Sequence, residues 1–129
     1  MKHILAVLAL VAFLPQAHAQ TRIADAAFVK AMTPPAEFDH RHKGIVIITR
    51  TKDQAETRKL CAVPFPMPLA IGCAKTVLAG TILVGCEIVI SPDSVIALAG
   101  LTLEFVKRHE IAHCNGWPAD HRGAREPAR

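Results

Sequence analysis

The sequence predicts an α+β fold, in which a small twisted β-sheet and a few helices form one disulfide-stabilised domain. A length of 129 residues is enough for one domain and too short for two. The runs 45–49 and 82–90 are rich in β-branched residues, as strands are, and the pattern becomes helical from Ser94 onward. A hydrophobic content of 51% and a net charge of only +4 exclude a disordered chain.

Residues 1–19 have the features of a secretory signal peptide. Lys2 precedes an unbroken apolar run over 4–14, and Ala17-His18-Ala19 offers the small residues at which signal peptides are cleaved. The apolar run is too short to span a bilayer, which argues against the alternative of an uncleaved anchor. Cleavage after Ala19 removes Lys2 and lowers the net charge from +4 to +3. Because the remaining positive charges are spread along the chain, a nucleic-acid partner is not expected.

The first elements of the exported chain follow in order. A helical pattern over 22–32 ends at Thr33-Pro34-Pro35, and a polar stretch over 37–43 leads into the strand 45–49. Asp53 can cap a short helix that runs to residue 60. We therefore expect a helix, a strand and a second helix before the alternating prolines of 64–68, which exclude a central strand there.

The second half of the chain predicts a strand over 71–77, a turn near residue 80 and a strand over 82–90. The last helix should run from about residue 100 to 114, because Asn115-Gly116 is a helix stop. The apolar stretch 69–106 contains charges and a proline, so it reads as buried core and not as a stable membrane span. We expect one domain over 20–121 and a flexible tail over 122–129.

All four cysteines lie in the exported part of the chain. An even number of cysteines in an exported protein favours disulfides over a metal site, and the chain has no Cys-x-x-Cys motif. Four cysteines allow three pairings. We favour Cys61–Cys73, which closes the proline-rich loop, and Cys86–Cys114, which ties a strand to the end of the last helix.

The chemistry-bearing motif of the chain is His109-Glu110-Ile111-Ala112-His113. Two histidines four residues apart lie on the same face of a helix, where both rings can reach one zinc ion. Glu110 then lies beside the open side of the metal and can take a proton from water at the zinc. The alternative without a metal site is a surface helix with two titrating histidines.

This HExxH motif resembles that of the zincin metallopeptidases. Gly116 also fits the extended pattern HExxHxxGxx(H/D) of metzincins and the snapalysin-like group, in which a third ligand follows a turn. The third position falls on Ala119, with Asp120 and His121 directly after it. The resemblance implies His109 and His113 as zinc ligands and Glu110 as the catalytic base. The third ligand is left open by the displaced position; we favour His121, with Asp120 as the alternative third ligand or a group that orients a histidine.

The resemblance covers about thirteen residues and leaves other roles open. No methionine follows Met67, so the methionine turn of metzincins is absent. Tyrosine is absent as well, and His40, His42 and Arg122 are the candidates to stabilise an oxyanion. Trp117 could line the substrate cleft or pack beneath the metal helix. The segment 86–90, with Glu87, Ile88 and Val89, is the candidate edge strand for pairing with an extended substrate.

The sequence thus predicts a secreted or periplasmic zinc metallopeptidase that hydrolyses a protein, a peptide or the peptide stem of a cell wall. One alternative is a zincin-like metal-binding or interaction module without catalytic activity. The other is a structural, disulfide-stabilised domain in which the motif is accidental.

Overall fold

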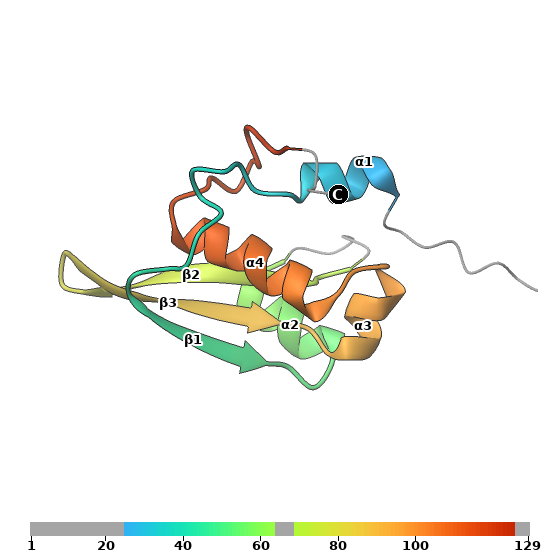
Figure 1. Ribbon diagram of the computed structural model, residues 1–129. Helices are drawn as coiled ribbons and strands as arrows, with labels where there is room; N and C mark the ends of the chain where they lie inside the picture. The colour runs from blue at the N-terminus through green and yellow to red at the C-terminus, as the bar shows by residue number, and fades with distance from the viewer. Residues whose placement is uncertain (1–24, 64–68, 126–129) are drawn as a thin grey trace, which may run out of the picture.

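The computed structural model describes residues 25–63 and 69–125. The predicted signal peptide and the alternating prolines of 64–68 lie outside the described residues. The described residues form four helices and three strands (Figure 1): α1 (Ala26–Ala31), β1 (Ile45–Arg50), α2 (Gln54–Cys61), β2 (Gly72–Ala79), β3 (Ile82–Ile90), α3 (Asp93–Leu98) and α4 (Leu103–Cys114). The fold is therefore α+β, as predicted, and no helix within the described residues is long and apolar enough to span a membrane.

The three strands form one sheet in the order β1-β3-β2. β3 pairs with β1 in parallel and with β2 in antiparallel orientation, so both of its edges are satisfied. The prediction of an edge strand at 86–90 is therefore wrong. Ile88 and Val89 are 0% and 1% exposed, and the half-buried Glu87 accepts a hydrogen bond from the Thr49 hydroxyl. β2, which pairs with β3 in antiparallel orientation, is an edge strand instead.

A helix packs on each face of the sheet over β2 and β3, and each face carries one of the two predicted disulfides. Both pairings are confirmed: Cys86–Cys114 fixes the end of α4 to β3, and Cys61–Cys73 fixes the end of α2 to β2. Cys73 is opposite Val89 in the register, so the two disulfides leave the sheet on opposite faces. Figure 1 shows α4 on one face and α2 on the other.

The core lies between α4 and the sheet. It consists of a cluster of buried apolar residues from β3, α3 and α4: Cys86, Ile88, Ile90, Ile96, Val106 and Cys114. The predicted last helix begins later than expected, because Gly100 adopts a positive φ of 76° and ends α3. Thr102 then caps α4 by accepting a hydrogen bond from the backbone N–H of Phe105.

The segments before β1 and after α4 lie together over the outer side of α4 (Figure 1). Arg125 donates backbone and side-chain hydrogen bonds to the carbonyl oxygens of Thr33 and Pro34, respectively. Its guanidinium also pairs with Asp39, which in turn pairs with Arg108 of α4. The tail predicted to be flexible is therefore anchored over residues 122–125.

Candidate metal site

The candidate site is built on α4, which carries both histidines of the motif on one face. His109 is 3% exposed and His113 is half-buried, and their ring centroids are 4.7 Å apart. The helix is fixed at its start by the Thr102 cap and at its end by the Cys86–Cys114 disulfide. Both rings therefore project from a rigid element, as a preorganised site requires.

Three imidazole nitrogens converge at this face. The Nε2 atom of His113 lies 3.1 Å from Nε2 of His109 and 3.2 Å from Nε2 of His121. Ligand atoms of all three residues lie within 4.8 Å of one another. Two nitrogens bound to one tetrahedral zinc ion at about 2.05 Å are about 3.3 Å apart, so the observed spacing suits a shared ion.

The outward-facing nitrogens of two rings are held by backbone carbonyl groups. Nδ1 of His109 is 2.7 Å from the carbonyl oxygen of Met32, and Nδ1 of His113 is 2.7 Å from that of Trp117. A carbonyl oxygen only accepts, so each Nδ1 carries a proton, and in the neutral form each ring presents an Nε2 lone pair to the other ring. Two lone pairs at 3.1 Å repel each other, and a shared cation or proton relieves that repulsion.

The third ring reaches the cluster through an unusual backbone conformation. α4 ends at Cys114, and Gly116, with a φ of +103°, turns the chain just beyond it; the following turn brings the His121 N–H to the Pro118 carbonyl oxygen at 3.0 Å. The backbone of His121 itself is in the left-handed conformation, with a φ of 56°, which costs free energy in a residue other than glycine. Asp120 instead forms an ion pair with Arg122 at 2.6 Å. His121, and not Asp120, therefore completes the cluster.

The side chain of Trp117 packs against the histidine cluster. Its ring stacks on that of His113, with centroids 5.0 Å apart and an interplanar angle of 13°. It is 2% exposed, and its Nε1 donates a hydrogen bond to the Arg122 carbonyl oxygen at 2.8 Å. The packing interpretation of this residue fits the structure, and the same ring also lines the adjoining cavity.

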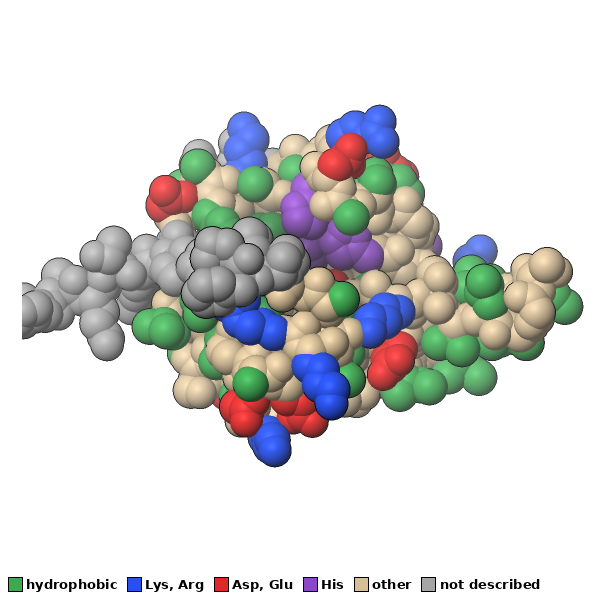
Figure 2. Space-filling model, turned by 180° about the vertical axis from the view of Figure 1, so that it is seen from behind, with side chains coloured by type: hydrophobic (Ala, Val, Ile, Leu, Met, Phe, Trp, Pro, Cys, Tyr) green, Lys and Arg blue, Asp and Glu red, His purple; other side chains and the backbone are tan. Residues whose placement is uncertain are grey.

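A cavity of about 580 Å³ opens beside the three histidines. Glu110 lines it together with residues 72–74 at the start of β2, and the remaining wall is mostly apolar. The histidines gather on the face of the molecule shown in Figure 2. Besides Trp117 and Ala119, the apolar wall comes mainly from four segments of the chain: Phe28 and Met32, Val63, Leu69 and Ile71, and Leu101, Phe105 and Val106.

Burial sets the protonation of the groups in this cavity. It raises the pKa of Glu110 to about 8, because a carboxylate loses hydration there. It lowers the pKa of His109 to about 4 and also lowers that of His121, mainly by the same loss of hydration. Both rings are therefore neutral at pH 7, the form that binds a metal ion.

Two supporting groups were not foreseen from the sequence. One is the Met32 carbonyl, which belongs to a segment 77 positions away from His109. The other is Gly72 of β2, because a Cβ atom there would lie 3.0 Å from Oε1 of Glu110 and 2.8 Å from the Val89 carbonyl oxygen. A glycine at the start of a strand is the only sequence signal for this close approach.

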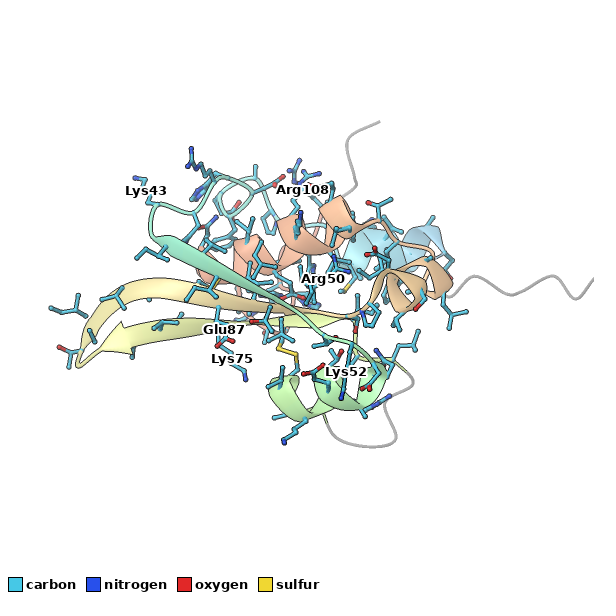
Figure 3. The ribbon with its side chains drawn as sticks, turned by 90° about the horizontal axis from the view of Figure 1, so that it is seen from below. Lys43, Arg50, Lys52, Lys75, Glu87 and Arg108 are labelled. Atoms are coloured by element: carbon cyan, nitrogen blue, oxygen red, sulfur yellow. A yellow bond between two sulfur atoms is a disulfide. The ribbon has the colours of Figure 1, made fainter. Side chains whose placement is uncertain are left out.

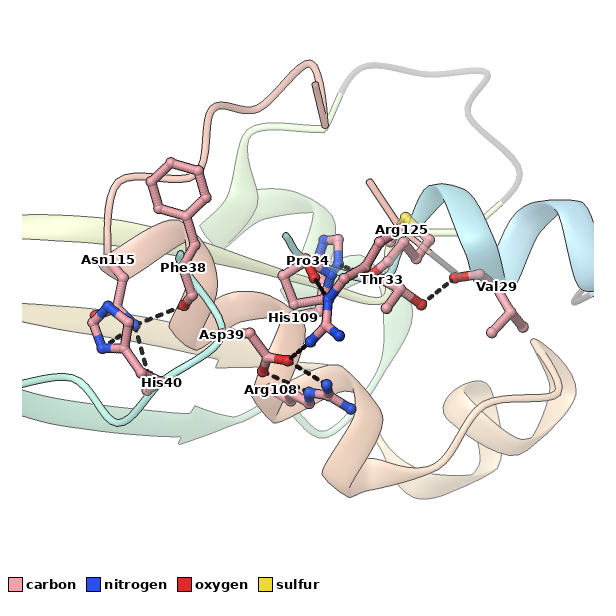
Figure 4. Close-up of polar contacts among 11 residues, drawn as sticks. Val29, Thr33, Pro34, Phe38, Asp39, His40, Arg108, His109, Asn115 and Arg125 are labelled. Carbon is pink, nitrogen blue, oxygen red and sulfur yellow. Dashed lines mark hydrogen bonds and ion pairs between the residues drawn. The ribbon is translucent and has the colours of Figure 1, made fainter. Parts of the chain in front are cut away.

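The residues predicted to stabilise an oxyanion lie elsewhere. His40 and His42 surround Asn115, whose side-chain amide donates to the carbonyl oxygens of Phe38 and His40 (Figure 4). Arg122 faces Asp120. None of the three candidates lines the cavity that contains Glu110.

A charged network fixes the segment that supplies the Met32 carbonyl. Asp39 pairs with Arg108 and Arg125, and Figure 4 shows these three side chains beside Pro34 and His109. The hydrogen bond from Arg108 and the positive charge of both arginines hold the pKa of Asp39 below its usual value. The carboxylate is therefore charged at neutral pH and holds three parts of the chain together.

No protein-family model, curated protein sequence or solved structure matches this chain.

Proposed function

We propose that this protein is an exported zinc-dependent peptide hydrolase. The observation that carries the proposal is the convergence of three imidazole nitrogens beside a cavity that contains a buried carboxyl group. Three histidine ligands leave a fourth tetrahedral position for water, which is the arrangement of catalytic zinc sites.

Zinc is the metal that suits this donor set. The three donors are neutral ring nitrogens, without the carboxylate and carbonyl oxygens that magnesium and calcium prefer. The Met32 and Trp117 carbonyls fix two of the rings in the tautomer that a metal needs. His109, His113 and His121 would hold the ion, which when bound polarises a carbonyl group and lowers the pKa of water.

Glu110 would transfer the proton. The carboxyl group lies next to His109 in the chain and lines the same cavity as all three histidines. As a carboxylate it takes a proton from the attacking water, and as an acid it returns that proton to the leaving amine. Its low exposure, 5%, separates it from bulk water and strengthens both interactions.

The start of β2 is the proposed place for the main chain of the substrate. β2 is an edge strand, and its residues 72–74 line the cavity beside Glu110. An extended peptide that adds to this edge would place successive side chains on alternate sides, one of them toward the apolar wall. A protein, a peptide or the peptide stem of a cell wall could bind in this way.

The experiment combines metal analysis with activity. We expect one zinc per chain in the purified protein, loss of zinc in His113→Ala, and retention of zinc in Glu110→Gln. Hydrolysis of peptide and muropeptide libraries should fall by about three orders of magnitude or more in Glu110→Gln. Glu104→Gln on the exposed side of the same helix is the matched control and should retain activity. Folded protein without zinc would contradict the proposal.

A second candidate is a metal-binding module without catalytic turnover. It is favoured by the cavity wall, in which the described residues include neither an arginine nor a fourth histidine that could stabilise an oxyanion. Zinc binding with no hydrolysis of either library by the wild-type protein would support this alternative.

A further inference from the structure

A hairpin projects from the sheet at the end opposite α3 (Figure 1). Four large apolar side chains on this hairpin are strongly exposed: Leu78 by 58%, Ile82 by 68%, Leu83 by 52% and Val84 by 40%. Single exposed apolar residues are ordinary, but a contiguous group on a protruding element marks a binding surface. No residue from 76 to 86 is charged.

The exposure occurs on both faces of the hairpin. Ile82, Leu83 and Val84 are consecutive residues of β3, so their side chains alternate between the two faces of the ribbon, and all three are exposed. A folded partner would cover one face of such a ribbon and leave the other in water. A lipid layer surrounds a shallowly inserted hairpin and removes both faces from water.

Basic residues lie at the base of this hairpin. The chain enters β1 at Ile45, which pairs with Gly85 of β3, and a Cβ atom on Gly44 would lie 3.7 Å from the Cα atom of Gly85. Arg41 and Lys43 directly precede this point and are exposed. Figure 3 shows Lys43 where the chain enters β1, at the hairpin end of the sheet.

Of the acidic groups around this basic segment, Asp39 is neutralised within the protein and Glu87 is partly withdrawn from solvent, whereas Glu37 is exposed. Asp39 is paired with Arg108 and Arg125, and Glu87 is half-buried and bonded to Thr49. On β1, Ile45 and Ile47 extend the apolar surface with exposures of 67% and 53%. An apolar tip with positively charged residues at its base is complementary to the surface of an anionic bilayer.

We propose that the hairpin over residues 78–84 inserts into the interface of anionic membranes, with Arg41 and Lys43 contacting the lipid headgroups. Insertion is shallow, because the outer edges of a two-stranded ribbon have unpaired backbone groups that still need water or headgroup partners. The hairpin anchors the domain at a membrane surface and does not span it.

Flotation with lipid vesicles tests the proposal. The protein recovered after export is mixed with vesicles of phosphatidylcholine alone or with about one third phosphatidylglycerol. We expect binding to the anionic vesicles, a loss of about tenfold or more in Ile82→Ser/Leu83→Ser, and a smaller loss in Arg41→Ser/Lys43→Ser. Salt at about 0.5 M should weaken binding of the wild-type protein.

The controls use exposed residues of the same types elsewhere. Leu98→Ser replaces a leucine that is 49% exposed on α3, and Lys52→Ser/Lys59→Ser removes two exposed lysines beside or within α2. Both variants should bind vesicles like the wild-type protein. Any retained leader segment is common to all variants, so the differences between them report on the hairpin.

Three outcomes would overturn the proposal. The first is no binding of the wild-type protein to either vesicle. The second is binding that the hairpin variant leaves unchanged. The third is a wild-type dimer, detected by light scattering, that Ile82→Ser/Leu83→Ser dissociates without a change in vesicle binding, since the hairpin would then contact a second copy of the chain.

Discussion

At the scale of single residues, Glu110 is where stability and proposed activity conflict. Its carboxyl group is 5% exposed, and burial raises its pKa to about 8. In the metal-free protein the group keeps its proton between about pH 4.5 and 8, whereas the unfolded chain releases it there. Stability therefore falls as the pH rises through this window, because the raised pKa belongs to an acid that is neutral when folded.

Glu110→Gln should remove this pH dependence. At pH 7 the metal-free variant should be more stable than the metal-free wild-type protein, by on the order of 2 kcal/mol, and at about pH 4 the two should be equal. Thermal unfolding after chelation, at both pH values, measures the difference. Glu104→Gln is the control and should follow the wild type; an equal slope for Glu110→Gln would contradict the expected effect of burial.

His121 and Asp120 give a second contrast at this scale. The ring of His121 joins the cluster, whereas the Asp120 carboxylate faces Arg122. His121→Ala should therefore weaken zinc binding by about 100-fold or more, while Asp120→Ala should change it by less than about tenfold. Competition with a chelator of known affinity measures both values, and the reverse order would reassign the third ligand.

At the scale of elements, α4 is fixed at its two ends by different means. The Thr102 cap at its start satisfies a backbone N–H, and the disulfide at its end joins Cys114 to the central strand. His113 directly precedes the disulfide-bonded cysteine. The end of the helix therefore bears directly on ligand position, whereas the start affects only the stability of the helix.

The two ends should respond differently to mutation. Thr102→Ala should lower the free energy of unfolding by about 1 kcal/mol and leave zinc affinity unchanged. Cys86→Ala/Cys114→Ala should lower it by about 3–4 kcal/mol, since the bond closes a loop with a sequence separation of 28, and should also weaken zinc binding. Denaturant unfolding and chelator competition separate the two effects. Unchanged zinc affinity in the double variant would show that the helix end positions His113 without the disulfide.

The sequence predicted the local features of these elements well and their pairing less well. The strand 82–90, the cap at Asp53 and the presence of disulfides follow from β-branched residues, capping chemistry and cysteine parity, whereas the pairing of the four cysteines was only favoured among three possibilities. The central position of β3 does not follow, because strand order depends on contacts between segments far apart in the chain. The split between α3 and α4 was missed because Gly100 lies inside an otherwise helical apolar pattern.

In the candidate site, too, the local features were predicted from the sequence and the features that depend on distant segments or backbone conformation were not. The spacing of His109 and His113 on one helix predicted their proximity, and the turn after Gly116 made a third ligand plausible. The choice of His121 over Asp120 depended on a left-handed residue, which the sequence does not reveal. The supporting Met32 carbonyl could not be predicted, because any residue type offers that oxygen.

At the scale of the whole molecule, Asp39 connects segments from both halves of the chain. Its carboxylate pairs with Arg108 on α4 and with Arg125 in the C-terminal segment, and it is only 13% exposed. The segment that it holds also supplies the carbonyl that orients His109. Loss of this carboxylate should therefore affect both the stability of the fold and the metal site.

Acidification tests this link. Because the folded pKa of Asp39 is lowered, its contribution is complete above the usual carboxyl pKa near 3.8 and is lost as the pH falls through the lower folded value. Asp39→Asn should cost about 1–2 kcal/mol at pH 7 and less near pH 2. Urea unfolding at both pH values measures the difference, with Asp53→Asn as a control for a carboxylate whose role is confined to a helix cap. A cost that persists near pH 2 would point to packing instead of charge.

The bond between Cys86 and Cys114 also has a consequence for the cell that makes the protein. In the reducing interior of a cell both sulfurs remain thiols, and the carboxyl end of α4 is not tied to the sheet. The proposed hydrolase would then bind its metal weakly during synthesis, and its metal affinity would rise only where the disulfide forms. Formation of the disulfide after export would therefore delay hydrolytic activity until the protein has left the cell, which protects the producing cell's own peptides.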